Sequence, residues 1–327
     1  MFNRKHLLIF SDLISFISCL VCAFLLNDYV EDKLILITTS SVLSLSMAIN
    51  SPSAKAVVPN VISSENIESF NSLQNTLSSA IKVVSPLVGA LLLSVFNNFN
   101  VFILINSLSF LISAILISTV PYNNIKQDSN KQNFVKRLVS GLKYVINKRK
   151  ILGILIFISF LNFIMISYDL ALPYIINVIL NKSEDFYSLT ISLEAIGGII
   201  GGIVLTYVSK RRKDSNFVSD IKYLCMILLI AGIFKNIYFI FGCALINGYF
   251  LVQINAKVFT IIQKETSQEY LGRVFSILFI FSSLLVSPSN IIFGKLVPVL
   301  SWNIFIFCSF SIFVMSYIVN KNFIKDN

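Results

Sequence analysis

The chain has 327 residues, of which 56% are hydrophobic and 13% are Asp, Glu, Lys or Arg. Its mean hydropathy of +0.81 excludes an ordinary soluble domain, because such a domain needs a charged and hydrated surface. The net charge of +10 would favour nucleic-acid binding in a soluble protein. Here the charges cluster in the turns between apolar runs, where they set membrane topology instead.

Apolar stretches of about 20 residues follow one another along the chain, and each is long enough to cross about 30 Å of hydrocarbon. A soluble core helix is seldom apolar on every face, as these stretches are. The sequence therefore predicts an all-α polytopic membrane protein with about ten transmembrane helices. The predicted spans are 7–26, 34–54, 73–95, 99–119, 151–172, 187–208, 219–234, 237–258, 274–296 and 300–319.

Successive turns between these spans are alternately poor and rich in Lys and Arg. The turns on one side carry few of them, as in 27–33 and 97–100. Lys and Arg concentrate in cytoplasmic loops, so we expect a multi-pass protein of the cell (cytoplasmic) membrane with both termini in the cytoplasm. The basic side holds Lys126, Lys131, Lys136, Arg137, Lys143, Lys148, Arg149, Lys150, Lys210, Arg211, Arg212, Lys213, Lys264, Arg273, Lys321 and Lys325.

A long polar loop, 120–150, divides the chain into a four-span part, 1–119, and a six-span part, 151–327. Residues 133–147 have the period of an amphipathic helix. Its predicted apolar face carries Phe134, Leu138, Leu142 and Val145. We interpret this segment as a linker helix on the cytoplasmic membrane surface.

The two parts repeat each other. Ala54-Lys55 ends the second span and Ala256-Lys257 ends the eighth, and each is followed by a polar turn with Ser-x-Glu and then by a span with a proline, Pro86 or Pro288. The offset stays at 202 to 204 residues. Internal repeats are typical of secondary transporters, whose substrate site lies between the repeated parts.

Ionisable residues deep in a span are costly and are functional candidates by default. Lys82 and Glu194 come to a similar depth at 1.5 Å per residue, and we expect them to pair. Such a pair either couples ion movement to transport or is a static neutralisation of two buried charges. Asp169, beside Tyr168 near the end of its span, either lines a cavity or is a solvated helix end.

Other polar and small residues in the spans have both functional and structural interpretations. Asn162, Gln253 and Asn255 either contact substrate or bond across helices. The glycines 197, 198, 201 and 202 form two overlapping G-x-x-x-G pairs, which predict close helix packing. Pro86 and Pro288 predict kinks that shape a cavity.

No catalytic or metal-binding chemistry is indicated. The single histidine, His6, lies beside Arg4 and Lys5 at the entrance to a span, where it suits a headgroup contact. The five cysteines all fall inside apolar spans, where Cys behaves as a small hydrophobe. We therefore expect no enzyme activity, no metal and no cofactor.

Several motifs resemble the major facilitator superfamily, and within it the bacterial drug and macrolide efflux branch, which also contains siderophore exporters. The motifs, in an order and spacing that cover essentially the whole chain, are Pro59 to Pro86, Asn106-Ser107-Leu108-Ser109-Phe110, Gly197-Gly198-Ile199-Ile200-Gly201-Gly202 followed by Ser209-Lys210-Arg211-Arg212, and Leu271-Gly272-Arg273-Val274.

The resemblance implies a secondary active transporter that exports amphipathic organic molecules by alternating access, with protons or another coupling ion. Its partners would be a small substrate and the lipid bilayer, not nucleic acid. The resemblance further implies that Asp12 pairs with Arg4 or Lys5 in a cytoplasmic gate, to which Arg273 also belongs, and that Lys82 and Glu194 face each other between the two halves.

The sequence departs from this family in two places. The family has twelve helices and this chain shows ten, and Met1-Phe2-Asn3-Arg4-Lys5 looks like the tail of a loop motif that follows the family's second helix. We therefore expect a four-helix N-terminal remnant that lacks the first two helices. The antiporter motif Gly-Pro-x-x-Gly-Gly appears as Ser85-Pro86-Leu87-Val88-Gly89-Ala90. The alternative function is a non-transporting remnant or a membrane interaction protein.

Overall fold

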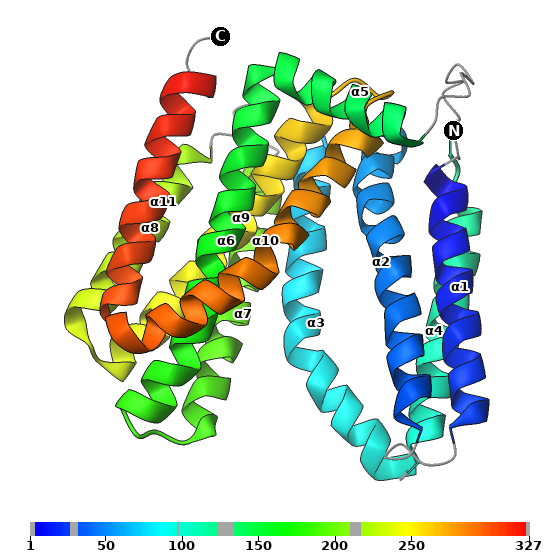
Figure 1. Ribbon diagram of the computed structural model, residues 1–327, viewed down its shortest axis with the longest axis horizontal. Helices are drawn as coiled ribbons and strands as arrows, with labels where there is room; N and C mark the ends of the chain where they lie inside the picture. The colour runs from blue at the N-terminus through cyan, green and yellow to red at the C-terminus, as the bar shows by residue number, and fades with distance from the viewer. Residues whose placement is uncertain (1–3, 27–31, 97, 123–133, 210–216, 325–327) are drawn as a thin grey trace. The chain divides into compact units, whose positions relative to one another are not determined.

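The computed structural model describes residues 4–26, 32–96, 98–122, 134–209 and 217–324, without the side chains of 83, 86, 87, 90, 91, 93, 94, 134–138 and 324. These residues form α-helices joined by short turns (Figure 1). The helices are α1 (Arg4–Leu25), α2 (Lys33–Val61), α3 (Ile67–Phe96), α4 (Phe99–Thr119), α5 (Phe134–Asn147), α6 (Arg149–Pro173), α7 (Glu184–Ser209), α8 (Val218–Phe234), α9 (Ile237–Glu265), α10 (Leu271–Leu300) and α11 (Asn303–Val319). Two π-helical segments, η1 (Tyr174–Ile179) and η2 (Asn320–Ile324), extend α6 and α11.

Each predicted span coincides with one long helix, and α5 coincides with the predicted amphipathic segment. Within the described residues, eight helices are long and apolar enough to cross a membrane, namely α1, α2, α4, α6, α7, α9, α10 and α11. The predicted spans outside this set are α3 and α8, and α8 has 17 residues. The all-α membrane fold is thus confirmed. Lys126, Lys131 and the basic run 210–213 lie outside the described residues.

The internal repeat extends to the helix boundaries. The helices α2 and α9 each have 29 residues, and α3 and α10 each have 30. Lys33 and Ile237 begin equivalent helices, as do Ile67 and Leu271, so the offset of 204 residues is kept across the polar turn. Both turns begin in the same way, since the amide N–H of Ile62 donates to Val58 and that of Thr266 donates to Ile262. The helix lengths repeat even where the residues differ.

The chain groups into two compact units, Met1–Ser63 with Val84–Asn133, and Ser64–Val83 with Phe134–Asn327. The first half of α3 therefore belongs with the C-terminal helices. The division predicted from the sequence, 1–119, 120–150 and 151–327, stays a prediction about the domains.

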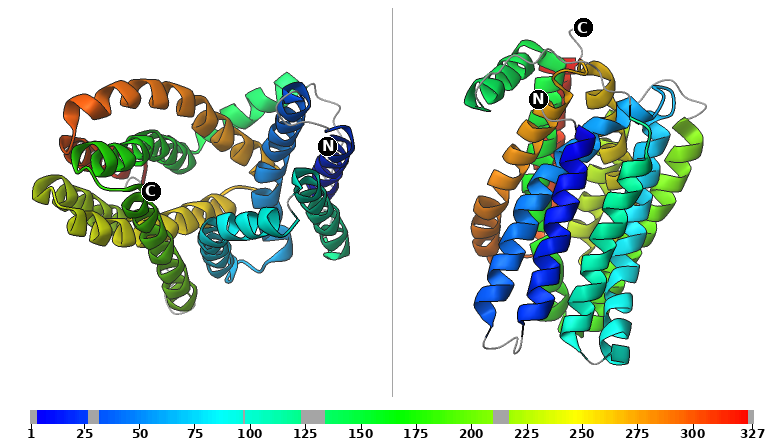
Figure 2. Two further views of the ribbon diagram at one scale, coloured as in Figure 1. Left: turned by 90° about the horizontal axis from the view of Figure 1, so that it is seen from below. Right: turned by 90° about the vertical axis from the view of Figure 1, so that its right-hand side faces the viewer.

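In the first unit, α1 packs between α2 and α4 (Figure 2). Cys19, Cys22, Ala23, Leu26 and Ile103 form its apolar core, because successive turns of α1 present small or apolar residues on one face. At one end of the unit, Lys5 Nζ donates to the carbonyls of Ser118 and Val120, 2.6 and 2.9 Å away. At the other end, Asn100 Nδ2 donates to the Leu26 carbonyl at 2.7 Å.

In the second unit, α6 is the central helix and packs against α10 and α11. Its apolar residues occur on all faces, which is typical of a helix enclosed by others. Phe157 and Tyr168 of α6 are each 1% exposed, and Tyr168 packs against Phe305 of α11 with ring centroids 5.8 Å apart. This packing joins the C-terminal part of α6 to α11.

Glycines set the close contacts of α7. A Cβ at Gly197 would collide with the Leu245 carbonyl, so α7 and α9 touch through their backbones. On the adjacent face, a Cβ at Gly202 would collide with Thr76 of α3, and one at Gly198 would lie 2.6 Å from Ser79 Oγ. The two G-x-x-x-G pairs therefore serve two different neighbours, Gly197 and Gly201 for α9, and Gly198 and Gly202 for α3.

The other predicted packing residues differ from this pattern. Among the described side chains, a Cβ at Gly89 would meet Phe102 alone, at 3.9 Å, which is an ordinary contact, so no described neighbour requires glycine there. The helix α10 contains Pro288 and Pro298 and is bent in Figure 1, as expected from the missing backbone donors. Pro86 lies within α3, and its side chain is outside the described residues.

Helix ends that the topology prediction places on the basic side also meet in the second unit. Lys150, at the start of α6, forms an ion pair of 2.8 Å with Glu265, at the end of α9. A Cβ at Gly153 of α6 would collide with the Phe323 side chain, near the C-terminus. The start of α6, the end of α9 and the C-terminal segment thus lie at one end of this unit.

Candidate functional site

A carboxyl group in the middle of α7 is the centre of the candidate site. Glu194 lies between the first glycines of the helix and its N-terminus, and it is only partly exposed. The Tyr168 hydroxyl of α6 donates to Glu194 Oε2 over 3.4 Å. A carboxyl group at this depth in an apolar helix is costly unless polar groups surround it.

Asn247 of α9 completes the immediate surroundings of Glu194. Its side chain is 0% exposed and interacts with the Glu194 carboxyl group. Neither Nδ2 nor Oδ1 has a partner of good hydrogen-bond geometry among the described residues. The adjacent Gly248 brings α9 close, since a Cβ there would collide with the Glu194 carbonyl. A buried amide without strong bonds costs about 1–3 kcal/mol, which favours a role that uses its free donor and acceptor.

Lys82 and Asp169 lie within electrostatic range of Glu194. Neither carboxyl group is within 4.0 Å of an amine among the described residues, so the predicted Lys82–Glu194 ion pair is not formed. Lys82 nevertheless follows a part of α3 that lies at the level of Glu194, because Ser79 lies opposite Gly198, one turn from Glu194. The direction of the Lys82 side chain differs from the prediction. The face of α3 that contacts α7 through Thr76 and Ser79 would continue at position 83, and Lys82 is one residue, or about 100° around the helix, away from it.

A polar seam between α3 and the helices α7 and α9 was not foreseen. Asn71 Nδ2 donates to Gln263 Oε1 at 2.6 Å and to Thr260 Oγ1 at 3.1 Å. Ser72 Oγ donates to the Gly202 carbonyl at 2.5 Å. Asn71 and Ser72 are both 0% exposed. The sequence carried a partial signal for this seam, because polar residues are concentrated in α3 at 71, 72, 74, 75, 76, 78 and 79, but their spacing does not show which of them face α7 and α9.

The predicted cytoplasmic gate is arranged differently. Asp12 is 5% exposed and accepts hydrogen bonds from Asn50 Nδ2 at 3.0 Å and Ser113 Oγ at 2.6 Å, not from Arg4 or Lys5. Arg4 Nη1 instead donates to the Ala56 carbonyl at 2.8 Å. Arg4 and Asp12 are eight residues apart, which is about 12 Å along a helix, so their side chains reach different turns of α2. The predicted pairing is therefore wrong.

Arg273, at the start of α10, binds α5. Its Nη1 donates to Ser140 Oγ at 2.9 Å, and its guanidinium lies over the Tyr270 ring at 4.7 Å. A weaker ion pair of 3.7 Å joins it to Glu269. The predicted gate residue thus joins α5 to α10 within the second unit.

The predicted cavity residues have different surroundings. Asn162 of α6 is exposed and donates to Ser282 Oγ of α10 at 3.4 Å, which is a bond across helices. Gln253 is 6% exposed and Asn255 is partly exposed, both on α9. Their proposed contact with substrate stays a prediction.

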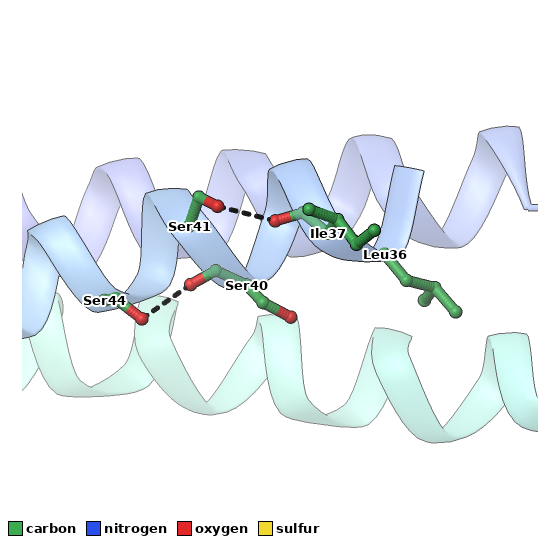
Figure 3. A pocket seen from close by; sticks show the side chains of 5 residues that line it. All are labelled: Leu36, Ile37, Ser40, Ser41 and Ser44. Carbon is green, nitrogen blue, oxygen red and sulfur yellow. Dashed lines mark hydrogen bonds between the residues drawn. The ribbon is translucent and has the colours of Figure 1, made fainter. Parts of the chain in front are cut away.

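A recess in the first unit is lined by Leu36, Ile37, Ser40, Ser41 and Ser44 of α2 (Figure 3). Ser41 Oγ donates to the Ile37 carbonyl and Ser44 Oγ to the Ser40 carbonyl, each at 2.8 Å. These hydroxyls are satisfied within their own helix, so the recess does not carry a polar site comparable with that around Glu194.

Comparisons with known proteins agree with this architecture. The model of the Major Facilitator Superfamily matches residues 1–289. Macrolide efflux protein A of Enterococcus faecalis is 27% identical over 239 residues, which cover 72% of this chain and 74% of that protein. The protein of the same name from Streptococcus pyogenes is 26% identical over 72% of this chain, but only 59% of its own length is matched. The Staphyloferrin A transporter of Staphylococcus aureus is 24% identical over 76% of this chain and 63% of its own length.

Solved structures show the same fold at low identity. A bacterial homologue of the iron transporter ferroportin in an outward-facing state has a TM-score of 0.68 at 18% identity and covers 98% of this chain and 81% of its own. An MFS transporter, FucP, in the outward conformation has a TM-score of 0.73 at 13% identity, over 97% of this chain and 83% of its own. At these identities the likeness concerns the fold alone.

Proposed function

Since this chain belongs to the Major Facilitator Superfamily, whose members are membrane transporters of small molecules, we propose that it exports amphipathic organic molecules by proton-coupled alternating access. The observation that carries the proposal is the carboxyl group of Glu194, held in the middle of the second unit between Tyr168 and the unsatisfied amide of Asn247. An embedded carboxyl group with polar neighbours suits reversible proton binding better than permanent neutralisation.

The substrate class is inferred from relatives. Two relatives with 26–27% identity carry the name macrolide efflux protein, and a macrolide is a large amphipathic molecule. The partly exposed Asn255 of α9, two turns from Asn247, is a polar contact suited to such a substrate. We propose export rather than uptake on the same basis, in the cell membrane with both termini in the cytoplasm.

Asn247 accounts for how the site accommodates both protonation states of Glu194. An ionised carboxylate accepts hydrogen bonds only, and the Asn247 Nδ2 and the Tyr168 hydroxyl are donors. A protonated carboxyl group needs an acceptor, and Asn247 Oδ1 is one. Rotation of the Asn247 side-chain amide exchanges its donor and its acceptor, so it can hydrogen-bond either the ionised or the protonated Glu194. No other residue then has to move when the proton arrives or leaves. Asp169 and Lys82 add a charge of each sign nearby.

The test is gradient-driven transport by the full chain in inverted membrane vesicles, with a radiolabelled macrolide as the probe. We expect Glu194→Gln to abolish accumulation driven by a pH gradient and to retain exchange of labelled for unlabelled macrolide, because exchange needs no net proton movement. Glu184→Gln, at the exposed start of α7, is the matched control and should transport like the parent.

Two results would contradict the proposal in different ways. Gradient-driven accumulation by Glu194→Gln would remove the coupling role from Glu194. Failure of the folded parent protein to bind, exchange or accumulate the macrolide would exclude this substrate class, and failure with a panel of amphipathic probes would favour the alternative of a non-transporting protein.

A further inference from the structure

The helix α5 is oriented unlike the membrane-spanning helices of its unit. Figure 1 shows it lying across the ends of those helices rather than alongside them. Only Lys148 separates its last residue, Asn147, from the start of α6 at Arg149. The Lys148 N–H bonds to the carbonyls of Tyr144 and Val145, both at 3.1 Å. The helix α5 is therefore joined to the start of the membrane-spanning helix α6 by a single, hydrogen-bonded residue.

One face of α5 packs against α10 and the turn before it, within the second unit. The rings of Tyr144 and Tyr270 stack with centroids 4.3 Å apart, and the Tyr144 hydroxyl accepts the Ser267 N–H at 3.1 Å. A Cβ at Gly141 would lie 2.9 Å from Arg273 Cβ, so this residue sets the close approach. Val145 is 2% exposed. These contacts fix the rotation of α5 about its own axis.

The opposite face of α5 is apolar and uncovered. Val139, Leu142 and Ile146 are 56%, 37% and 59% exposed, and their spacing of three and four residues places them in one stripe. Of the predicted apolar face, Phe134 and Leu138 lie outside the described side chains, Val145 is buried, and Leu142 lies on the exposed stripe instead. The helix has two apolar faces, and the small Gly141 decides which one docks.

We propose that the stripe of Val139, Leu142 and Ile146 is inserted into the boundary between headgroups and acyl chains of the lipid bilayer. The charges beside the stripe fit this partner, because the exposed Lys143, Lys148 and Arg149 suit lipid phosphates. An amphipathic helix with apolar residues on one side and Lys or Arg beside them lies in the plane of the interface. The stripe also ends, at Ile146, within a few residues of the start of α6 at Arg149, so its end is already held at that depth.

Insertion of α5 into the bilayer interface would also affect α10, because the docked face of α5 contacts it. Arg273 and Tyr270 connect α5 to the first turn of α10, so a helix fixed in the interface also fixes the depth of α10. The bilayer would then act as a stationary support for the second unit.

The test uses the single tryptophan of the chain, Trp302, replaced by phenylalanine so that one new tryptophan reports alone. The full chain with Ile146→Trp is placed in phosphatidylcholine vesicles with bromine atoms on the acyl chains, either near the headgroup or near the chain end. We expect at least twofold stronger quenching by the bromines near the headgroup. Tyr144→Trp, on the docked face, is the matched control and should show no such preference.

Each other outcome overturns the proposal. Emission typical of water, without quenching by bromine, would place the stripe in solvent. Blue-shifted emission without quenching would mean that protein covers it, either another part of this chain or a second copy. Equal or stronger quenching by bromines near the chain end would place Ile146 inside the hydrocarbon rather than at its boundary. None of these outcomes bears on whether the protein transports a macrolide.

Discussion

The ion pair between Asp220 of α8 and Lys257 of α9 allows a quantitative prediction. Lys257 Nζ lies 2.6 Å from Asp220 Oδ2, and the two side chains are 11% and 9% exposed. At an effective dielectric constant of about 20, the attraction over that distance is about 6 kcal/mol. Desolvation of two ions costs several kcal/mol each. The pair as a whole therefore contributes little, whereas one partner left alone is strongly unfavourable.

Lys257→Met should lower the free energy of unfolding by about 3–5 kcal/mol, because it leaves the Asp220 carboxylate buried and unpaired. The double change Asp220→Asn with Lys257→Met should recover most of this loss. Denaturant titration of the purified full chain in mixed micelles, followed by circular dichroism, measures the difference.

A second ion pair serves as the control. Lys150 and Glu265 are separated by a similar distance, 2.8 Å, but their side chains are 37% and 47% exposed. Solvent screening reduces such a pair to about 0–1 kcal/mol, so Lys150→Met should cost less than 1 kcal/mol. If Lys257→Met is as mild as Lys150→Met, or if the double variant is no better than the single one, burial does not govern these pairs and the reasoning fails.

Two further predictions follow from the packing and from the charge distribution. Gly197→Ala should destabilise the protein by about 1–3 kcal/mol, as overpacking does, because its Cβ meets the Leu245 backbone. Gly242→Ala, whose Cβ would meet no described atom within 4 Å, should be neutral in the same titration. A single cysteine at Asn98 should react with an impermeant thiol reagent from outside intact cells and one at Asn130 should not, since Lys and Arg mark the cytoplasmic side; the reverse pattern would overturn the topology.

Sequence reasoning succeeded where a one-dimensional pattern carries the information. The presence of α2, α3, α9 and α10 follows from the apolar runs, and the repeat follows from their spacing, although α2 and α9 each continue seven residues beyond the predicted ends at 54 and 258. Hydrocarbon thickness fixes the length of each span, so the existence of the helices needed no knowledge of their neighbours.

The site was harder to predict because it depends on rotation and on partners far apart in the chain. Depth along a helix placed Lys82 level with Glu194, but a difference of one residue turns a side chain by about 100°. The sequence does not distinguish Asn247 from Gln253 and Asn255, because all three are polar residues in the same apolar helix. Only the contact made at Gly248 distinguishes Asn247, and that contact requires the fold of α7 against α9.

The shared position of α3 has a consequence for how the protein is made. Asn71 is synthesised 192 residues before its partner Gln263, and translation at about 5–20 residues per second makes that interval about 10–40 s. Throughout this time Asn71 lies in a helix whose partner α9 is still being made, and Ser72 precedes its own partner Gly202 by 130 residues. Their polar groups must remain hydrated or be held by the insertion machinery until α7 and α9 arrive. The polar seam therefore forms only after α9 has been made, and slow translation between α4 and α9 should lengthen the exposure of this nascent helix.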